Sequence, residues 1–518
     1  IEPRLDLFQQ GWWWTVALGV YIGAVLICVG AVCDVPADAA HLPDESHSAA
    51  QPPPAARDYA LWLALAAVPA VLLQASTTRL TLDVAAVPFL WMLPLATYLL
   101  TFIVAFEYRN WYQRRPMTMF VVVTPFIAIP DGPAVLTVAI TLLALAVVGL
   151  TMHGELAARA PAPRYLTRYF LLVSAGGVIG SALVAFGAPF AFSGVLEYPL
   201  SFVLALAVLA AIYARAIHEP VTSGTASGAR LIAVSLSILA VMVGIHTAAV
   251  WRWTNEAALH ASRNFFGAIR VRDRDLPSGS RYRRFDHGTT MHGAQFLDAE
   301  RARRPAAYFT AESGIGRAMA LVRRDGTARR IGVLGQGAGT VAAFGKPGDS
   351  ITFFEIDPDV IALSTGANPL FTYVRDSEAR VTIVEGDGRL ALERAAPSAF
   401  DVLVMDAFSS DAVPAHLLTR EAMAIYVQHL RDPHSLLIVN VTNRYLDLYD
   451  VVAVAGRTVG LEAVRLDQEA SGELIEGTSW MILSRDTALL DALGPRYAPR
   501  DVRPWTDAFS NLLGVIRW

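Results

Sequence analysis

The sequence predicts a membrane α-helical bundle followed by an α/β Rossmann-like domain, with a small β element on the N-terminal side of that domain. Long apolar runs lie almost entirely before Val250, whereas most charged residues lie after it. Two segments of loosely alternating polarity come next, and four short apolar runs then each end in an acid or a glycine loop. We therefore expect a transmembrane domain at 1–250, a β-strand element at 251–310 and a Rossmann-like nucleoside-binding domain at 311–518.

Composition supports a membrane protein of more than one domain. The chain has 518 residues, of which 54% are hydrophobic and 17% charged. Its net charge of -4 gives no reason to expect a nucleic-acid partner. Lys346 is the only lysine, so arginine supplies the remaining positive charge. Cys28 lies in an apolar run and Cys33 at its end, which predicts neither a disulfide framework nor a thiolate metal site.

Apolar windows of about 20 residues predict about eight membrane spans, with the lipid bilayer as the first partner. The expected spans are 12–32, 59–74, 84–106, 117–129, 133–152, 169–192, 200–214 and 231–250. Asp83 lies between two apolar runs beside Arg79, where it either caps the next helix from an interfacial loop or forms a buried polar site. The chain begins at Ile1 without a charged n-region or a cleavage site, so we expect no signal peptide and further sequence upstream.

The side of the membrane occupied by the soluble half is left open by the sequence. With eight spans, the arginine-containing loops all lie on one side, which the positive-inside rule makes cytoplasmic. The soluble half would then emerge on the opposite side, whereas a nucleoside cofactor made in the cytoplasm argues the reverse. We expect a multi-pass protein of a bacterial inner (cytoplasmic) membrane, and one miscounted span would remove the conflict.

Two antiparallel strands are predicted at 266–272 and 281–285, with a turn between them. The following segment contains His287 and His292 among glycines. Two histidines can suggest a metal site, but no cysteine or close acid completes a ligand set. We therefore expect no metal and interpret this segment as a loop that lines a pocket.

The glycine loop after the first apolar run of the Rossmann-like domain predicts a nucleoside site. Gly335, Gly337 and Gly339 lie between a predicted strand and a predicted helix at 341–344, where glycine lets the backbone approach a ligand. Glu355 ends the next strand about 20 residues later, where a carboxylate can accept both ribose hydroxyls. Asp387 follows the third strand, in a position to accept from an adenine amino group. The alternative is an ordinary α/β sheet with polar loops.

The fourth strand ends at Asp406, and Asp411 follows in the same loop. Two carboxylates beside a cofactor crevice suit a cationic amine, and one of them can accept a proton from the reacting nitrogen. The alternative is a helix N-terminus capped at 410 or 411, which is compatible with a separate role for Asp406. Further strands are expected at 436–441, 462–465 and 480–483.

At this point the motifs resemble those of spermidine synthases, the polyamine aminopropyltransferases. The matching segments are Val333-Leu-Gly-Gln-Gly-Ala-Gly, Phe354-Glu-Ile-Asp-Pro, Glu385-Gly-Asp-Gly-Arg and Val404-Met-Asp-Ala-Phe-Ser-Ser-Asp. The family has the methyltransferase-type Rossmann fold and moves an aminopropyl group from decarboxylated S-adenosylmethionine to putrescine, releasing methylthioadenosine. The resemblance implies that the three glycines hold the cofactor, Glu355 its ribose and Asp387 its adenine. It assigns Asp406 as the catalytic acid and Asp411 as the second amine-binding acid.

Other motifs resemble integral-membrane spermidine-synthase-like proteins. They are Thr81-Leu-Asp-Val-Ala-Ala-Val-Pro-Phe-Leu-Trp, His153-Gly-Glu-Leu-Ala, Asn264-Phe-Phe-Gly, His287-Gly-Thr-Thr-Met-His-Gly-Ala-Gln and Trp505-Thr-Asp-Ala-Phe-Ser-Asn. Such proteins usually carry further spans upstream, which agrees with missing N-terminal sequence. Soluble spermidine synthases grip the diamine with an acidic segment that carries a tyrosine and a glutamate. Here only Gln295, Tyr308 and Glu312 are available as substitutes, and we assign Gln295 and Tyr308 to substrate binding.

Two hypotheses follow. The first is a membrane-anchored aminopropyltransferase that uses decarboxylated S-adenosylmethionine and a small amine, or S-adenosylmethionine in a related activity, with Asp406 assisting amine attack. The second is a non-catalytic membrane scaffold that binds a membrane-protein partner and retains its Rossmann domain, since a fold does not fix a function. The intact series from Gly335 to Asp406 favours the first, and the altered diamine grip favours the second.

Overall fold

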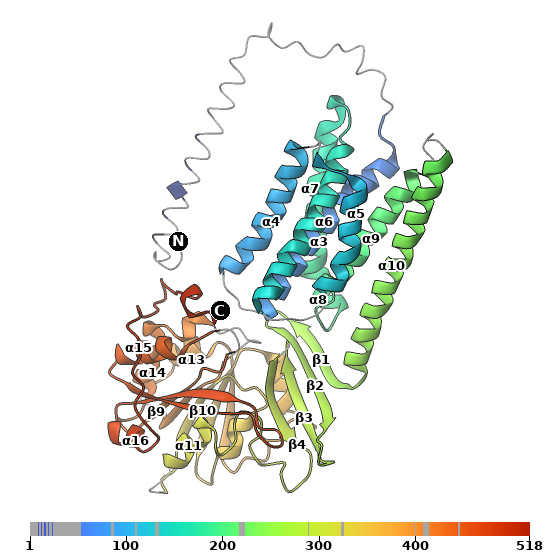
Figure 1. The fold of residues 1–518 in the computed structure, drawn as a ribbon. Coiled ribbons are helices and arrows are strands. Elements are labelled where there is room, and N and C mark those ends of the chain that lie inside the picture. Colours follow the sequence, from blue (N-terminus) through green and yellow to red (C-terminus); the bar gives the residue numbers. More distant parts are fainter. Residues whose placement is uncertain are drawn as a thin grey trace. The chain divides into compact units, whose positions relative to one another are not determined.

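The computed structural model describes residues 53–517 apart from 84–87, 109–110, 130–133, 217–222, 289, 323–325, 398, 408–413 and 444–445, and a few single positions before residue 53. The chain forms two compact units (Figure 1). One is built mainly from residues up to Trp253 and is helical, and the other is built mainly from Thr254 onward and contains both sheets. Each unit is described by itself.

Apolar helices form the first unit. Their bounds are α3 Ala56–Asp83, α4 Pro88–Glu107, α5 Arg114–Ala128, α6 Ala134–Ala158, α7 Leu166–Ala182, α8 Ala188–Ala191, α9 Glu197–Ala216 and α10 Ser223–Glu256. A π-helical turn, Leu183–Gly187, joins α7 to α8. Within the described part of the chain, five helices are long and apolar enough to cross a membrane: Ala56–Thr81, Val135–Ala158, Pro163–Ala191, Glu197–Arg215 and Ser227–Glu256. This finding indicates a multi-pass membrane protein.

Three of the eight expected spans are not among these five helices. The span expected at 12–32 lies almost wholly outside the described residues. The one expected at 84–106 corresponds to α4, in which the apolar segment Trp91–Glu107 is shorter, and the one expected at 117–129 lies in the 15-residue helix α5. The number of spans and the side of the soluble unit stay predictions. Asp83 ends α3, but its side chain lies outside the described part of the structure.

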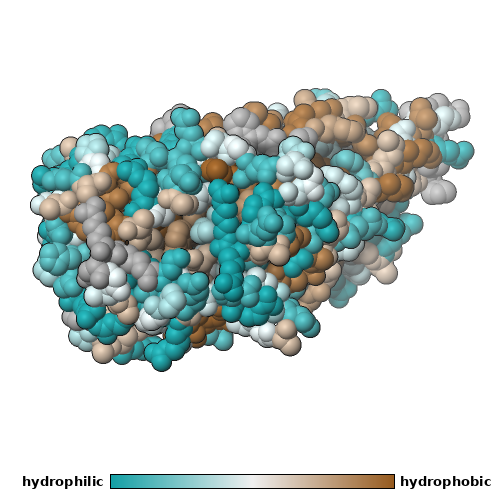
Figure 2. Space-filling view, turned by 90° about the horizontal axis from the view of Figure 1, so that it is seen from below, coloured by the Kyte–Doolittle hydropathy of each residue, from teal (hydrophilic) through white to brown (hydrophobic). Residues whose placement is uncertain are grey.

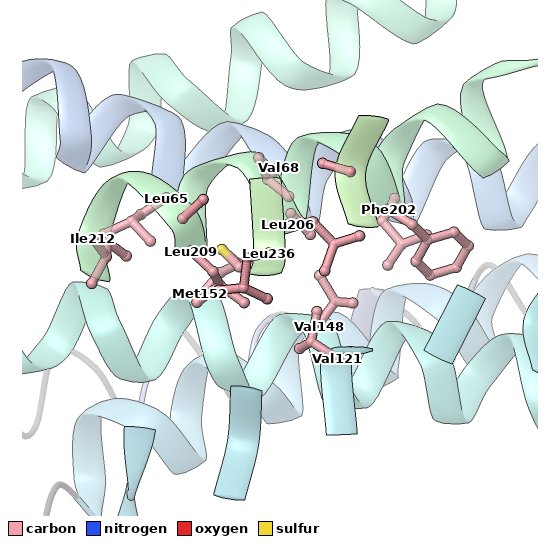
Figure 3. Packing of buried hydrophobic residues seen from close by; sticks show 14 of the residues in the cluster. Leu65, Val68, Val121, Val148, Met152, Phe202, Leu206, Leu209, Ile212 and Leu236 are labelled. Atoms are coloured by element: carbon pink, nitrogen blue, oxygen red, sulfur yellow. The ribbon is translucent and has the colours of Figure 1, made fainter. Parts of the chain in front are cut away.

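The helices of the first unit are apolar both inside and outside. Figure 3 shows the interior, where side chains from α3, α5, α6, α9 and α10 pack together, among them Leu65, Val121, Met152, Phe202 and Leu236. The outer faces also carry large apolar side chains, such as Leu171, Phe186 and Phe190, which are 68%, 72% and 94% exposed. A helix bundle that is apolar both in its interior and on its outer surface is typical of a protein surrounded by lipid hydrocarbon rather than by water.

The few charged groups inside the first unit have partners. Glu155 of α6 is fully buried and forms ion pairs with Arg114, at 2.5 Å, and with Arg159. Arg79 of α3 is 7% exposed and donates to the carbonyl oxygen of Ala128 at the end of α5. Ionisable groups at such positions are expensive unless they are paired, so these contacts account for them structurally.

A four-stranded antiparallel sheet begins the second unit. Its strands are β1 Ala258–Asn264, β2 Gly267–Asp275, β3 Arg281–His287 and β4 Thr290–Phe296, paired in chain order. One face carries Ile269, Val271 and Phe285, which are buried with residues of the following domain, including Val360 and Phe371. The small β element that the sequence predicts is therefore confirmed, with two more strands than the two expected.

The large sheet has seven strands: β5 Arg330–Leu334, β6 Ser350–Glu355, β7 Arg380–Glu385, β8 Val402–Met405, β9 Leu436–Asn440, β10 Glu462–Gln468 and β11 Thr478–Ser484. Their spatial order is β10-β11-β9-β8-β5-β6-β7. Strands β5 to β9 are parallel to one another, whereas β11 runs antiparallel between β9 and β10. Numbered within the domain, this order is 3-2-1-4-5-7-6, so the predicted methyltransferase-type Rossmann fold is confirmed.

Helices cover this sheet, and short polar residues begin several of them. The helices are α11 Gly314–Leu321, α12 Pro358–Ser364, α13 Gly388–Arg394, α14 Arg420–His429, α15 Tyr449–Arg457 and α16 Thr487–Asp491. Ser313, Asp357, Asp387 and Thr419 each cap the helix that follows, by accepting from a backbone N–H in its first turn. The helix expected at 341–344 is a short 3₁₀ helix, Thr340–Phe344.

The surface of the second unit differs from that of the first. Among its described residues, the exposed large hydrophobic side chains are Leu259, Phe265, Ile356 and Leu390. On the face shown in Figure 2, which looks from below relative to Figure 1, hydrophilic side chains in teal predominate in the nearer part. The second unit thus has the polar surface of a domain that contacts water, as the uneven charge distribution in the sequence predicts.

Candidate functional site

A cavity of about 320 Å³ opens at the carboxyl ends of the parallel strands in the second unit. Its walls come from the ends of β5, β6 and β8, from the start of α13, and from the small sheet. The chain leaves β5 toward β6 on one side and returns to β8 on the other, so the cavity lies at the switch point where open α/β sheets bind ligands. Its volume lies at the low end of the range usual for small-molecule sites.

The glycine loop follows β5 with a backbone that only glycine adopts easily. Gly335, Gly337 and Gly339 have φ angles of 88°, 54° and 77°. A Cβ on Gly335 would lie 2.4 Å from the carbonyl oxygen of Asp406, and one on Gly337 would lie 2.8 Å from that of His292. Gly335 and Gly337 line the cavity, whereas Gly339 lies behind it against Val374. The loop therefore presents backbone to the cavity without side chains in the way.

Glu355 ends β6 and is 8% exposed at the cavity wall. Its Oε2 accepts from the backbone N–H of Gln336, at 2.8 Å, and its Oε1 from that of Asp357, at 2.9 Å. Burial raises the pKa of this carboxyl above its ordinary value, and these backbone hydrogen bonds oppose the rise. The two bonds fix the carboxylate against the glycine loop and leave lone pairs on both oxygens for a ligand.

Asp387 caps α13 at the other side of the cavity. Its Oδ1 accepts from the N–H of Leu390 at 2.9 Å, and its Oδ2 lies 3.4 Å from Nε2 of His416, which also lines the cavity. Arg389 stabilises the segment that carries His416, because its Nη1 donates to the carbonyl oxygen of His416 at 2.7 Å. Asp507 holds Arg389 through two hydrogen bonds of 2.8 and 2.6 Å.

Asp406 lies directly after β8, half-buried at the opposite end of the cavity. The amide of Asn440 donates to its Oδ1 at 2.7 Å, and the hydroxyl of Tyr308 donates to the same carboxylate. Burial raises the pKa of Asp406 to about 7, against the lowering effect of these two hydrogen bonds, and the charge of Glu355 adds to the rise. A carboxyl with a pKa near neutrality is suited to take up a proton.

Tyr308 is the sequence-predicted substrate residue that meets Asp406 in the cavity. Its side chain is 9% exposed, and burial together with the charge of Asp406 raises the pKa of its hydroxyl well above the ordinary value. Tyr308 therefore remains a hydrogen-bond donor throughout the neutral range.

Gln295, the other such residue, does not line the cavity. Its amide is 2% exposed and is occupied by the carbonyl of Ala302, the hydroxyl of Thr372 and the N–H of Thr372, each at 2.9 Å. The expectation that Gln295 contacts substrate therefore finds no support in its position, because its donors and its oxygen are already bound to protein. Asp411 lies outside the described residues.

Aromatic and imidazole side chains from the small sheet complete the cavity wall, namely Phe265, Phe266, Phe285, His287 and His292. The two histidine rings lie 5.6 Å apart, and Nε2 of His287 is 3.0 Å from the carbonyl oxygen of Phe266. Burial lowers the pKa of His287. Among the described residues, no group of three or more His, Cys, Asp and Glu side chains is placed to hold a metal ion.

Three features of the site could not be inferred from the sequence. Asn440 ends β9 and His416 lies in a 3₁₀ helix, and each reaches the site only because the sheet places neighbouring strand ends together. The link from Asp507 to Arg389 joins residues that are 118 positions apart. The Trp505-Thr-Asp-Ala-Phe-Ser-Asn motif was a signal that this segment had a role, but nothing in its composition indicates the partner.

Known proteins are similar to the second unit only in fold. No protein-family model and no curated protein sequence matches the chain. A crystal structure of a probable spermidine synthase from Corynebacterium glutamicum ATCC 13032 is 16% identical over 49% of this chain and 97% of that one, with a TM-score of 0.35. A spermidine synthase in complex with the transition-state analogue AdoDATO is 13% identical over 48% of this chain and 82% of that one, with a TM-score of 0.32.

MnmC2 from Aquifex aeolicus is 14% identical over 50% of this chain and 79% of that one, with a TM-score of 0.28. These matches are distant and extend over about half of the chain. The similarity is one of fold, which the strand order of the large sheet defines.

Proposed function

We propose that the second unit is a membrane-anchored transferase that uses decarboxylated S-adenosylmethionine and moves its aminopropyl group to a small amine. The observation that carries the proposal is the position of Asp406, with its pKa near 7, in one cavity with the glycine loop, Glu355 and Asp387. A nucleoside site and a proton acceptor in one cavity are the two requirements of such a reaction.

The residues present suit the nucleoside. Gly335 and Gly337 leave space beside backbone groups, and the oxygens of Glu355 retain lone pairs for ribose hydroxyls. Asp387 accepts from the N-terminus of α13 with Oδ1, and its Oδ2, which lies 3.4 Å from Nε2 of His416, keeps a further lone pair for the amino group of adenine. The sulfonium of the co-substrate supplies the leaving group and makes the adjacent methylene electrophilic.

Asp406 would act on the acceptor. An amine is protonated at neutral pH and attacks only when neutral. Asp406 takes the proton from its nitrogen, the nitrogen forms a bond to the methylene carbon, and the carbon–sulfur bond breaks to release methylthioadenosine. Tyr308 and Asn440 hold the carboxylate in place during this step. The identity of the amine, including putrescine, belongs to the proposal.

The decisive experiment measures methylthioadenosine. The purified full chain, in detergent, is incubated with decarboxylated or ordinary S-adenosylmethionine, with and without diamines, and binding of methylthioadenosine is measured in parallel by calorimetry. We expect release of methylthioadenosine with the decarboxylated co-substrate that increases when an amine is added. Binding without turnover under any condition would favour a non-catalytic scaffold, and neither binding nor turnover would reject the nucleoside site itself.

A further inference from the structure

A cluster of arginines lies on one face of the small sheet, on strands β2 and β3. In the register of β2 and β3, Arg270 is opposite Asp286 and Arg272 is opposite Arg284. Directly opposite residues of antiparallel strands point to the same face, so these four side chains share one face. Ile269, in contrast, points to the other face, where it is buried.

The positive charges of this cluster exceed the carboxylates available to them. Asp286, with a side chain 5% exposed, accepts from Arg272 at 2.8 Å and from Arg284 at 2.5 Å. The side chain of Arg270 makes no ion pair and no hydrogen bond with any residue in the described part of the chain, and its Nε is enclosed. The charge of Glu476 raises the pKa of Arg284, but no ion pair joins these two described side chains. One buried carboxylate therefore faces three arginines: it accepts hydrogen bonds from two of them, and it acts on Arg270 only through its charge.

The state of Arg270 is energetically unfavourable without an anion. Its side chain is partly buried, its Nε is enclosed without a partner, and its neighbour Arg272 has the same charge. Burial and this like charge lower the pKa of Arg270. A charged group that leaves water without a partner costs free energy, so an anion that entered the cluster would gain from both charge and hydrogen bonds.

We propose that Arg270, Arg272 and Arg284 bind a phosphate group, carried by a lipid headgroup or by a free phosphate-containing molecule. Guanidinium groups match phosphate oxygens in pairs, and several converging arginines are typical of phosphate sites. A lipid is a plausible carrier of this phosphate because the arginines lie close in the chain to a candidate membrane span. Arg272 pairs with Ala258 of β1, and Ala258 comes two residues after the end of the span Ser227–Glu256. This site does not depend on the proposed transferase activity.

Thermal unfolding of the full chain in neutral detergent tests the proposal. The probes are phosphatidylglycerol, with phosphatidylcholine as the zwitterionic comparison, and sodium phosphate, with sodium chloride at equal ionic strength. We expect the wild type to be stabilised by phosphatidylglycerol or by phosphate beyond the comparison. Arg270→Gln should weaken the apparent affinity about tenfold, because a charge-assisted hydrogen-bonding partner is lost.

Arg270→Gln is chosen because the side chain of Arg270 has no hydrogen bond or ion pair to the residues that the structure describes, so the unliganded protein should melt at the same temperature or higher. Arg281→Gln is the matched control, since Arg281 is on the same strand as Arg284 but points to the opposite face, with a side chain 60% exposed. Stabilisation by phosphatidylglycerol alone identifies a lipid site, and stabilisation by sodium phosphate identifies a free-phosphate site. No stabilisation by either, equal stabilisation of Arg270→Gln, or a lower unliganded melting temperature of that variant would overturn the proposal.

Discussion

The two ends of the cavity are built in different ways. At the nucleoside end, each residue follows its own strand: Gly335 follows β5, Glu355 ends β6, and Asp387 comes two residues after β7. At the acceptor end, Asp406 directly follows β8, but its carboxylate is positioned by side chains from other parts of the chain. Its partners Tyr308 and Asn440 come from a loop before β5 and from the end of β9. The first end is therefore encoded locally, and the second is assembled by tertiary packing.

This difference predicts how each end should respond to substitution. In the proposed function, the nucleoside end has several ligands that act in parallel, whereas the acceptor end has one reactive carboxylate that Tyr308 and Asn440 hold in place. Loss of one nucleoside ligand should weaken binding and leave the reaction intact. Loss of the reactive carboxylate should stop the reaction and leave binding intact.

Replacement of the reactive carboxylate should have the largest effect. Asp406→Asn preserves size but removes the proton acceptor, so we expect turnover to fall by about 10²- to 10⁴-fold. Methylthioadenosine release measures the rate, and calorimetry with methylthioadenosine should show nearly unchanged affinity. Asp491→Asn, on an exposed side chain of α16, is the control. Unchanged turnover in Asp406→Asn would remove Asp406 from the mechanism.

Replacement of Glu355, the proposed ribose ligand, should have the next largest effect, on binding. Glu355→Gln removes the charge from a buried acceptor that already binds two backbone N–H groups, so methylthioadenosine affinity should fall by about 10- to 100-fold. Turnover at saturating co-substrate should change much less. Glu462→Gln, on a side chain 41% exposed in the edge strand β10, provides a control with the same change of charge. A folded Glu355→Gln variant with wild-type affinity would show that the nucleoside does not contact this carboxylate.

The fold, and the placement of Gly335, Glu355 and Asp387 around one cavity, could be predicted from the sequence for the same physical reason. Strand ends in a parallel sheet converge on one edge, so an acid or glycine after an apolar run has a foreseeable position. Gln295 shows the limit of this reasoning. Its amide would suit a substrate, but packing of β4 against the segment around Thr372 engages it instead. Asn440 was missed for the converse reason, because its role appears only when β9 is placed beside β8.

The dependence of turnover on pH should sharpen the assignment at the acceptor end. Burial raises the pKa of Asp406 to about 7, and the carboxylate form is the one that accepts a proton. The quantity kcat/KM should therefore rise about tenfold per pH unit below 7 and level off above it. Tyr308→Phe removes a hydrogen bond that lowers this pKa, so the midpoint should move upward by up to about one unit. An unmoved midpoint would indicate that another group titrates.

Replacement of Asp507, a residue far along the sequence that supports the nucleoside end, should have the smallest effect. Asp507 binds Arg389, and Arg389 binds the carbonyl oxygen of His416 beside Asp387. Asp507→Asn keeps one acceptor and loses the charge, and the side chain of Asp507 is half-exposed, so the expected loss is about 1 kcal/mol. Calorimetry should then show methylthioadenosine affinity reduced by about fivefold, with the midpoint of the pH profile unchanged because Asp406 is at the other end.

Asp491→Asn again serves as the control for a lost surface carboxylate. If Asp507→Asn moved the pH midpoint while leaving nucleoside affinity alone, the two ends of the cavity would not be separable in the way their construction implies. If Asp507→Asn changed neither the pH midpoint nor the nucleoside affinity, the contact of Asp507 with Arg389 would stabilise α13 without influencing the ligand. A loss confined to affinity would show that residues 118 positions apart in the sequence cooperate at the locally encoded end as well.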